Sequence, residues 1–405
     1  METLRFVMVT THYPPSHIGG DAVFVKYLSE ELVKSGHEVH VFHNPSVYRM
    51  LGNVRASKTL VPIEHHPIQH AHEKGFSSFR TGMAHVTGLS GGALDELEKL
   101  TRRIGADVVH WHNTKAFIGR PVSLGGRISL FTAHDYYAVC PKGGLLKPHG
   151  EICTDPRLCQ YCLISSGKLP QLWRLGRRRV FRFEEDIRVL CPSMFMAQRL
   201  RQYGVKVDHV LRNFVPVPPS VERPLVEPDP FILYVGIMER HKGPMTLLEA
   251  FNATKNNHGF RMRMIGRGSM LKCLRDRVAR LGLEDRVSLP GHLGRSELLS
   301  FLGSAAALAV PSEWYENAPL VALEAMAIGT PVIGSDIGGL PEIVNLQPRP
   351  MTFEAGNLDS LSKALVSTWQ NQDSLPRLRR GVKEAFLSNF SPKVHVDEYL
   401  RVIKN

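Results

Sequence analysis

Short apolar runs recur along the first half of the chain, separated by longer stretches in which apolar residues return every three or four positions. The runs are nearly continuous rather than alternating, which is typical of parallel strands buried on both faces. The stretch 22–35 has helical spacing, and Gly36 is suited to end that helix. The strand-like runs are residues 6–9, 39–42, 108–110, 128–132 and 189–191. This pattern predicts a doubly wound α/β domain.

The same alternation begins again after a proline-rich stretch at residues 216–230, whose composition is typical of a linker. The new strand-like runs are residues 231–235, 262–265, 287–289, 306–310 and 332–333. Since 405 residues exceed what one core normally serves, we predict two Rossmann-like domains, at 1–212 and 213–390. We expect a last helix at 391–405 to pack back on the first domain. Ligands bind beyond the carboxyl ends of such strands, so the expected site is a cleft between the domains.

Composition narrows the class of protein and its partners. The chain is 43% hydrophobic and 22% charged, which is ordinary for a globular protein. Its N-terminus lacks the features of a signal peptide, and no apolar stretch approaches the roughly 20 residues of a membrane span, so we expect a cytoplasmic protein. The net charge of +12 suggests an anionic partner. Nucleic acid is the weakest choice, because zinc-finger spacing and an RNP-type aromatic motif are missing.

Basic and aromatic residues alternate in the segment 174–188. One interpretation is a solvated face of a helix. The other is contact with an anionic membrane surface or a polyprenyl phosphate, which would suit a lipid-linked acceptor near Trp173 and a peripheral position at the inner membrane surface.

The segment 311–333 carries the strongest chemical signal. It reads as the end of a strand, a loop, and a helix that begins near Pro319, since proline suits the first helical position. A helix N-terminus at the end of a strand favours phosphate through its free N–H groups and its dipole. Glu316 falls in the loop and Glu324 in the helix, so the two carboxylates can bind different hydroxyl groups of one extended ligand.

This segment resembles the paired-glutamate signature of the retaining glycosyltransferases of family 4, which have the GT-B fold. The other similar stretches are 211–214, 234–236 with Lys242-Gly243, 265–268 and 335–342, so the resemblance covers most of residues 211–345. It implies two doubly wound domains facing a cleft, a nucleoside diphosphate sugar as donor, and no cofactor required for catalysis. It further implies a saccharide or lipid-linked saccharide acceptor, in polysaccharide or glycoconjugate assembly.

The resemblance also implies roles for residues on the donor side. Glu324 would hold the ribose, Glu316 the transferred sugar, and Lys242 the diphosphate, with Glu316 and Lys242 acting in catalysis. No residue is an evident nucleophile, so the leaving phosphate itself would take the proton of the acceptor. Further donor contacts are expected at Gly236, Gly266, Asn317, Ala318, Pro319 and Leu320.

One departure from the family pattern keeps alternatives open. Gly236 is followed by Ile237, where the family usually has arginine, and we expect Arg240 or another cation to replace the missing guanidinium. The departure is the only support for one alternative, a non-catalytic carbohydrate- or membrane-binding protein. The intact Glu316, Glu324, Lys242 and His134 weigh against that alternative. A nucleotide-sugar epimerase on the same scaffold is a further alternative, which would form product without an acceptor. A dinucleotide oxidoreductase is disfavoured, because the glycine fingerprint with its ribose-binding acid is missing.

The first half carries the acceptor-side candidates. Gly19 and Gly20 follow the first strand, and the resemblance suggests that they face the donor phosphates or the reacting sugar. His134 ends another strand, where the family places a histidine near the reacting sugar. An imidazole there can donate a hydrogen bond to a hydroxyl or exchange a proton near neutral pH. The remaining candidates are Asp135, which could orient His134 or bind the acceptor, and His112 with Asn113.

Four cysteines cluster in an insertion at about residues 138–168, namely Cys140, Cys153, Cys159 and Cys162. Four thiolates would satisfy a tetrahedral zinc ion and hold a loop that has little core of its own. The spacing is not that of a standard zinc ribbon, so structural zinc and unmetallated thiols are equally open.

Histidines are frequent between residues 44 and 95, at positions 65, 66, 70 and 72. We interpret this segment as a surface or acceptor loop rather than as a metal site.

Overall fold

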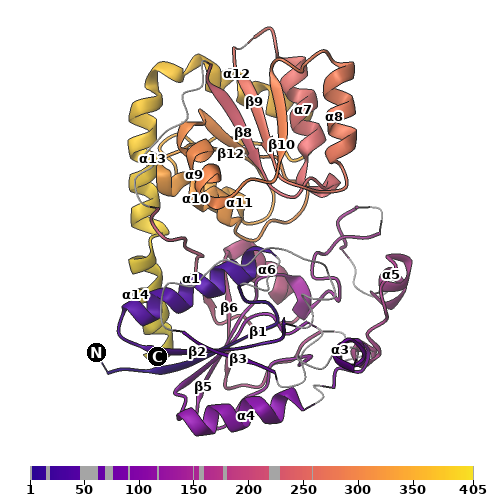
Figure 1. The fold of residues 1–405 in the computed structure, drawn as a ribbon, viewed down its shortest axis with the longest axis vertical. Coiled ribbons are helices and arrows are strands. Elements are labelled where there is room, and N and C mark those ends of the chain that lie inside the picture. Colours follow the sequence, from indigo (N-terminus) through magenta and orange to yellow (C-terminus); the bar gives the residue numbers. More distant parts are fainter. Residues whose placement is uncertain are drawn as a thin grey trace. The chain divides into compact units, whose positions relative to one another are not determined.

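The computed structural model describes residues 2–14, 19–45, 63–68, 76–89, 92–115, 118–148, 150–154, 159–176, 180–218, 229–257 and 259–404. Two compact units make up the chain, as drawn in Figure 1. The first holds residues 1–212 and 395–405, and the second holds residues 213–394. His70, His72, the three arginines at 177–179 and residues 219–228 of the proline-rich stretch lie outside the described residues.

The first unit is built on a parallel sheet of seven strands in the order β3-β2-β1-β4-β5-β6-β7. The chain starts in the middle, builds one side, and then crosses to the other, which confirms the doubly wound arrangement predicted from the apolar runs. All four residues of β4 (Val108–Trp111) are buried, as expected for a strand covered on both faces. The strands are β1 (Arg5–Thr10), β2 (Glu38–His43), β3 (Glu64–Pro67), β4 (Val108–Trp111), β5 (Ile128–Thr132), β6 (Ile187–Cys191) and β7 (His209–Val210).

Helices connect these strands in the manner that local sequence signals predict. At the start of α6 (Met194–Gln202), the Ser193 hydroxyl accepts a hydrogen bond from the Met196 backbone N–H at 3.3 Å, which satisfies a donor that the helix itself cannot pair. The helices are α1 (Gly20–Lys34), α3 (Phe76–Thr87), α4 (Ala93–Ile104), α5 (Cys159–Ser165), α6 (Met194–Gln202) and α14 (Pro392–Lys404), with short 3₁₀ turns η2 (Tyr136–Ala138) and η4 (Leu172–Arg174).

The last helix, α14, contributes its residues from His395 onward to the first unit. Tyr399 is fully buried, and its hydroxyl lies 2.8 Å from Nδ1 of His110 on β4. Arg188 on β6 donates a hydrogen bond to the backbone oxygen of Ile403 at 3.1 Å. These contacts attach the end of the chain to the sheet of the first unit.

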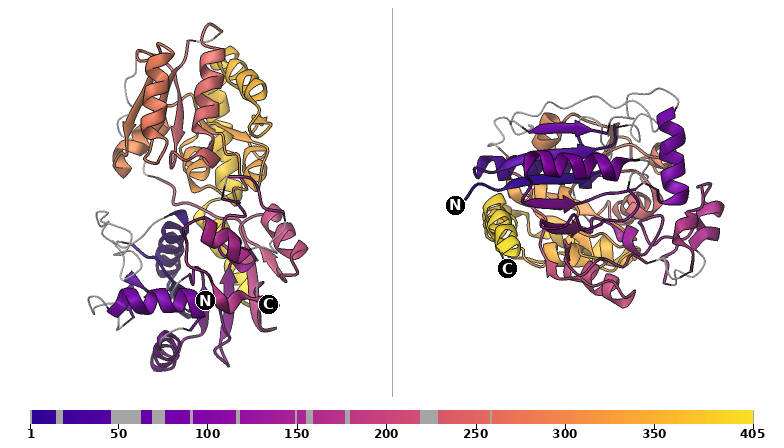
Figure 2. Two further views of the ribbon diagram at one scale, coloured as in Figure 1. Left: turned by 90° about the vertical axis from the view of Figure 1, so that its right-hand side faces the viewer. Right: turned by 90° about the horizontal axis from the view of Figure 1, so that it is seen from below.

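The second unit contains a parallel sheet of six strands in the order β10-β9-β8-β11-β12-β13, with helices on both faces (Figure 2). Its strands are β8 (Phe231–Val235), β9 (Arg261–Ile265), β10 (Val287–Gly291), β11 (Ala307–Val310), β12 (Val332–Ser335) and β13 (Thr352–Phe353). Its helices are α7 (Pro244–Ala253), α8 (Leu271–Arg280), α9 (Arg295–Ser304), α10 (Leu320–Ile328), α11 (Leu340–Val344), α12 (Leu358–Gln370) and α13 (Leu375–Asn389), with 3₁₀ turns η6 (Arg240–Lys242) and η7 (Gln372–Ser374).

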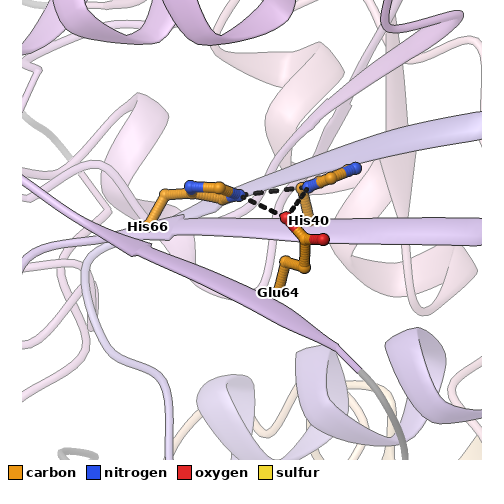
Figure 3. A group of neighbouring side chains, drawn as sticks. All are labelled: His40, Glu64 and His66. Carbon is orange, nitrogen blue, oxygen red and sulfur yellow. Dashed lines mark hydrogen bonds and ion pairs between the residues drawn. The ribbon is translucent and has the colours of Figure 1, made fainter. Parts of the chain in front are cut away.

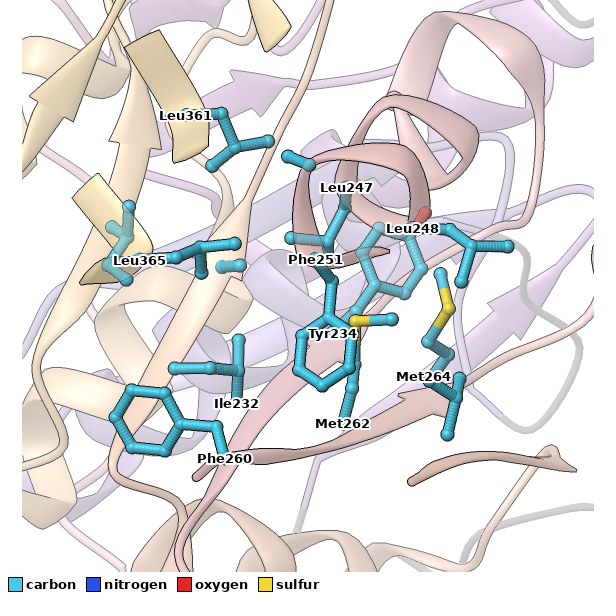
Figure 4. Close-up of a cluster of buried hydrophobic side chains, with 14 of the residues drawn as sticks. Ile232, Tyr234, Leu247, Leu248, Phe251, Phe260, Met262, Met264, Leu361 and Leu365 are labelled. Atoms are coloured by element: carbon cyan, nitrogen blue, oxygen red, sulfur yellow. The ribbon is translucent and has the colours of Figure 1, made fainter. Parts of the chain in front are cut away.

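One hydrophobic cluster shows how this second sheet is held (Figure 4). Ile232 pairs in register with Met262, and Tyr234 with Met264, so these four side chains leave the sheet on the same face. Residues of α7 and α12 pack against them, namely Leu247, Leu248, Phe251, Leu361 and Leu365. Truncating Phe251 to alanine is therefore expected to cost about 3–5 kcal/mol.

Two segments differ from their predicted structure. His65 and His66 lie on the edge strand β3 rather than on a surface loop, because backbone pairing with β2 forms the strand without an apolar pattern of its own. Arg174 is buried rather than part of a solvated helix face. Its guanidinium donates hydrogen bonds to the backbone oxygens of Tyr137 and Ala138, at 2.7 and 3.1 Å. Among the described residues, no helix is both long and apolar enough to span a membrane.

Candidate active site

The loops at the carboxyl ends of β8, β9 and β11 pack backbone against backbone. A Cβ on Gly266, whose φ is 152°, would lie 1.8 Å from the backbone oxygen of Gly236. A Cβ on Gly243 would lie equally close to the backbone oxygen of Pro311. Only glycine fits at both positions, so the family-like glycines allow three loops to meet at one edge of the sheet. This edge is where ligands bind in open α/β sheets.

Glu316 is a buried, ionised carboxylate at this edge. It is 7% exposed, and its Oε1 lies 2.6 Å from Nζ of Lys242 and 2.5 Å from the hydroxyl of Ser312, which donates to it. Burial alone would raise the pKa of Glu316, but the Lys242 ammonium and the Ser312 hydrogen bond outweigh it and hold the pKa below the usual value. Lys242 comes from η6 and Glu316 from the loop after β11, so the fold brings these two predicted residues together.

An aromatic side chain supports this ion pair. Nζ of Lys242 lies 4.6 Å from the ring centre of Trp314, within the range of a cation–π contact. The Trp314 ring in turn packs edge-on against His241, with their ring centres 4.7 Å apart. The ammonium is thereby held between a carboxylate and an aromatic face.

The helix after Glu316 begins near Pro319, as the sequence predicts. Pro319 has a ψ of 116° and precedes the helix, and α10 begins at Leu320. Asn317, Ala318, Pro319 and Leu320 are all partly exposed. The first N–H groups of α10 have no partner within the helix, so this end of α10 is suited to an anion.

Glu324 lies inside α10 and is also buried. Its Oε1 is 2.5 Å from Nη1 of Arg295, the first residue of α9. Burial raises the pKa of Glu324, and the guanidinium of Arg295 offsets only part of that effect. The two glutamates of the signature therefore have opposite electrostatic environments.

The predicted replacement for the missing clamp arginine has an exposed side chain. Ile237 is 54% exposed and Arg240 is also exposed, on the loop that carries Lys242. Arg267, between Gly266 and the next glycine, is a second exposed cation on a neighbouring loop. Cations are thus available on the loops of β8 and β9.

Three histidines of the first unit lie together, with His110 and His112 buried and His134 partly exposed. Nε2 of His134 lies 2.9 Å from Nδ1 of His112, whose ring is tilted by 38° against that of His110, with 3.9 Å between the ring centres. His110 also contacts the hydroxyl of Thr132, at 2.8 Å from Nε2. Burial lowers the pKa of all three histidines; the nearby carboxylates of Asp21 and Asp135 partly oppose this at His134. All three rings are therefore neutral at pH 7.

The other acceptor-side candidates are tied to residues that the sequence analysis does not single out. Asn113 donates a hydrogen bond from Nδ2 to Asp21 at 2.8 Å, beside the exposed Gly19 and Gly20. Asp135 forms an ion pair with Lys115 and caps η2 by accepting from the Tyr137 backbone N–H, at 2.8 Å. The direct partner of the His134 ring is thus His112, while Asp135 acts on it through its charge. In all, the structure adds five residues that contact the predicted site residues of the two units, namely Asp21, Lys115, Arg295, Ser312 and Trp314.

Cys159 lies within electrostatic range of the other three cysteines of the insertion, although among the described residues no three of the four sulfur atoms lie within 4.8 Å of one another. Cys140 is buried, and the other three are partly buried. Burial, together with the neighbouring Cys140, Cys153 and Cys162, raises the pKa of the Cys159 thiol to about 11. The free Cys159 thiol is therefore protonated at pH 7, and its thiolate would require a cation to neutralise it.

Comparison with known proteins gives consistent matches over nearly the whole chain. Residues 18–217 match the family model described as Glycosyltransferase Family 4, and residues 220–385 match that described as Glycosyl transferases group 1. The chain is 26% identical to an uncharacterized glycosyltransferase of Methanocaldococcus jannaschii, covering 90% of each protein. It is also 26% identical to the glycogen synthase of Mycobacterium tuberculosis, covering 96% of this chain and 91% of that protein.

Solved structures share the fold. A glycosyltransferase from Rickettsia africae aligns with a TM-score of 0.66 at 17% identity, covering 100% of this chain and 98% of that one. Anabaena HepE in complex with UDP-glucose aligns with a TM-score of 0.63 at 15% identity, covering 99% of each chain. At these identities the likeness is one of fold.

Proposed function

Since the chain belongs to the family 4 glycosyltransferases and has their GT-B type of fold, we propose that it transfers a sugar from a nucleoside diphosphate sugar to a hydroxyl acceptor, with retention of configuration. The observation that carries this proposal is Glu316. It is buried, ionised and held by Lys242 at the carboxyl ends of the second sheet. A carboxylate whose charge is maintained before substrate arrives can stabilise positive charge on the sugar as its bond breaks.

The second unit would bind the donor. The side chain of Lys242 and the N-terminus of α10 would neutralise the diphosphate, with Arg240 as an additional exposed cation. Glu324 would accept hydrogen bonds from the ribose hydroxyls, and Glu316 from the sugar hydroxyls. The glycine loops at 236 and 266 would let the backbone approach the phosphates closely.

The first unit would bind the acceptor near His134. A neutral imidazole can donate or accept a hydrogen bond without adding charge to the site. In the transfer step, the bond between the anomeric carbon and the diphosphate oxygen breaks, and the acceptor oxygen bonds to that carbon on the same face. The acceptor proton moves to the departing phosphate oxygen, so no protein nucleophile is needed. Asp135, His112 and Asn113 would position His134 and the acceptor.

Relatives support a role in glycan assembly. Two matched proteins are named as biosynthetic glycosyltransferases, for colanic acid in Escherichia coli and for amylovoran in Erwinia amylovora, at 27% and 29% identity over 40% and 35% of this chain. The solved complexes of Anabaena HepE with UDP and with UDP-glucose support a nucleotide sugar as the type of donor. The nucleotide base, the transferred sugar and the acceptor are to be identified by the experiments described below.

We further propose that the acceptor is lipid-linked and that the first unit contacts a membrane surface. Leu169, Leu172 and Leu175 are each more than half exposed around η4. Beside them, Trp173 and two arginines, Arg120 and Arg182, line a cavity of about 590 Å³. Apolar side chains next to cations match a lipid chain and its phosphate. Binding to anionic lipid vesicles should be lost when Leu172 and Leu175 are both replaced by glutamate; unchanged binding would contradict this proposal.

We propose that the four cysteines of the insertion hold a structural zinc ion, which would replace their thiol protons and draw together sulfur atoms of which, among the described residues, no three lie within 4.8 Å of one another. Metal analysis of protein purified in reductant tests this. Less than about a tenth of an equivalent of zinc would reject the proposal.

A donor screen tests the function itself. Unfolding temperature is measured with UDP-, GDP- and ADP-sugars for the wild type, Glu324→Ala and the surface control Glu284→Ala. One nucleotide family should stabilise the wild type and the control by about 2.7 kcal/mol at a hundredfold excess over the dissociation constant. Glu324→Ala should show no shift. If no donor shifts the wild type, the chain is a non-catalytic member of the family.

Transfer is then assayed with the stabilising donor and a panel of acceptors. Glu316→Gln should abolish transfer while leaving donor binding measurable, and the anomeric configuration of the product should match that of the donor. An altered nucleotide sugar formed without acceptor would indicate an epimerase instead. Full activity of Glu316→Gln would refute the role of Glu316.

A further inference from the structure

Two neighbouring strands of the first unit bring metal-ligating side chains to one face of the sheet. In the pairing of β2 with β3, His40 lies opposite Glu64, and Phe42 lies opposite His66. Side chains alternate along a strand and register partners point the same way, so His40, Glu64 and His66 share a face. Figure 3 shows the three side chains converging. Glu38, two residues before His40, belongs to this face as well.

The distances match those of ligands around one ion. Nδ1 of His40 lies 3.1 Å from Nε2 of His66 and 3.4 Å from Oε2 of Glu64. Nε2 of His66 lies 3.7 Å from the same carboxylate oxygen. For metal–ligand bonds of about 2.1 Å at tetrahedral angles, neighbouring ligand atoms are about 3.4 Å apart. In the described part of the chain, this is the only group of three such side chains whose ligand atoms all lie within 4.8 Å of one another.

The hydrogen bonding around His40 leaves the correct nitrogen available. Nε2 of His40 lies 2.6 Å from Oε1 of Glu38, so this nitrogen carries the proton and donates it to the carboxylate. Nδ1 then presents its lone pair toward Glu64 and His66. A carboxylate behind a histidine ligand is a recurrent arrangement in metal sites, because it fixes the tautomer and makes the ligand more basic.

The surroundings favour a cation. The charged groups that act on this cluster are Glu38, Glu64 and Arg103. Glu38 and Glu64 supply two negative charges against the single charge of Arg103. The side chain of Glu64 is 72% exposed, which gives an ion access from solvent, while that of His40 is buried.

We propose that His40, Glu64 and His66 bind a divalent transition-metal ion, with zinc the best match to two imidazoles and one carboxylate, and with water completing the coordination. The ion would join the edge strand β3 to β2, and so protect an edge that would otherwise be held by few hydrogen bonds. This site is separate from the proposed donor, acceptor and cysteine sites, and it does not depend on the proposed function.

The test measures zinc and cobalt binding to chelator-treated full-length protein by equilibrium dialysis. A Cys159→Ser/Cys162→Ser background removes two thiols of the cysteine cluster, so that binding there does not mask this site. Four proteins are compared in this background: one with all three ligands unchanged, His66→Ala, Glu38→Gln, and the matched control His65→Ala. His65 is the adjacent residue but points to the opposite face, where its ring centre lies 5.2 Å from that of Tyr13.

One equivalent of metal should bind to the background protein and to the His65→Ala control. His66→Ala should bind at least about a hundredfold more weakly, and Glu38→Gln about tenfold more weakly. Binding of cobalt should give visible bands without a thiolate charge-transfer band, and it should weaken as the pH falls below 6.5. Circular dichroism of the metal-free variants establishes that they are folded. Equal metal binding by the His66 and His65 variants, or no binding to the background protein, would overturn the proposal.

Discussion

Replacing Lys242 with methionine tests whether the second unit keeps a charged glutamate buried by means of one cation. Glu316 is 7% exposed, and its carboxylate lies 2.6 Å from the Lys242 ammonium. Removing one partner of a buried ion pair costs about 3–5 kcal/mol, because the other charge stays buried without compensation. Lys242 keeps 22% of its side chain exposed, and Ser312 still donates to Glu316. We therefore expect a loss at the lower end, about 3 kcal/mol.

The double variant Lys242→Met/Glu316→Gln should recover about 2 kcal/mol of this loss, because a neutral amide needs no cation and still accepts from Ser312. Both single variants and the double variant should lack transfer activity, so stability and activity separate. Urea unfolding of the full chain measures the losses, and amide exchange of β8 and β11 assigns them to the second unit. A Lys242→Met variant as stable as the wild type would refute the reasoning. So would a double variant whose loss equals the sum of the single losses.

Three further outcomes are expected. Alanine at Gly266 should destabilise the second unit by about 3 kcal/mol or more, since φ is 152° and a Cβ would lie 1.8 Å from a carbonyl oxygen. Alanine at the control position Gly282, with φ of 61° and open space around it, should cost only about 1 kcal/mol; urea midpoints of both variants decide. Lowering the pH from 6.5 to 5 should cost about 1.6 kcal/mol for each of His43 and His395, whose pKa burial lowers to about 4. The unfolded chain takes up these protons and the folded chain does not, so stability that is present above pH 6.5 is lost as the pH falls; an unchanged urea midpoint between pH 7 and 5 would contradict this. Glu324→Gln should keep its thermal stability or gain up to about 1 kcal/mol, because burial raises the pKa of Glu324 and its charge is costly, yet nucleotide binding should disappear; a large loss of stability would argue that the charge is structural.

The sequence predicts the strands of both sheets wherever burial on two faces leaves a continuous apolar run. It misses β3, β7 and β13, which are short and lie at sheet edges. The residues of β3 show the reason most clearly. Glu64, His65 and His66 carry no apolar pattern, and the strand exists because its backbone pairs with β2. Periodicity reports side-chain burial, so a strand held mainly by backbone hydrogen bonds leaves no such signal.

The residues of the candidate site also differ in whether the sequence reveals them. Glu316, Glu324 and Lys242 stand out in the sequence because they belong to a family-like segment with a recognisable spacing. Arg295 does not, because it opens a different helix and meets Glu324 only through the packing of α9 against α10. Ser312 is close in sequence to Glu316, yet a serine after a strand is too common to indicate its hydrogen bond. Tertiary contacts of this kind set the charges of the site, and a linear pattern does not encode them visibly.

The pKa values of the two signature glutamates shift in opposite directions, which suggests that the two carboxylates have different roles. Burial disfavours charge at both. At Glu316 the ammonium and hydroxyl partners outweigh burial, so the charge is maintained before any ligand binds. A carboxylate prepared in this way needs no reorganisation as positive charge develops on a sugar, which is the requirement for transition-state stabilisation. At Glu324 the guanidinium offsets burial only in part, so the carboxylate lacks some of the stabilisation that its charge requires. Ligand hydroxyl groups that donate hydrogen bonds to Glu324 would supply the missing stabilisation. The free energy gained in this way appears as binding affinity rather than as reaction rate. The electrostatics therefore fit a binding role for Glu324 and a catalytic role for Glu316.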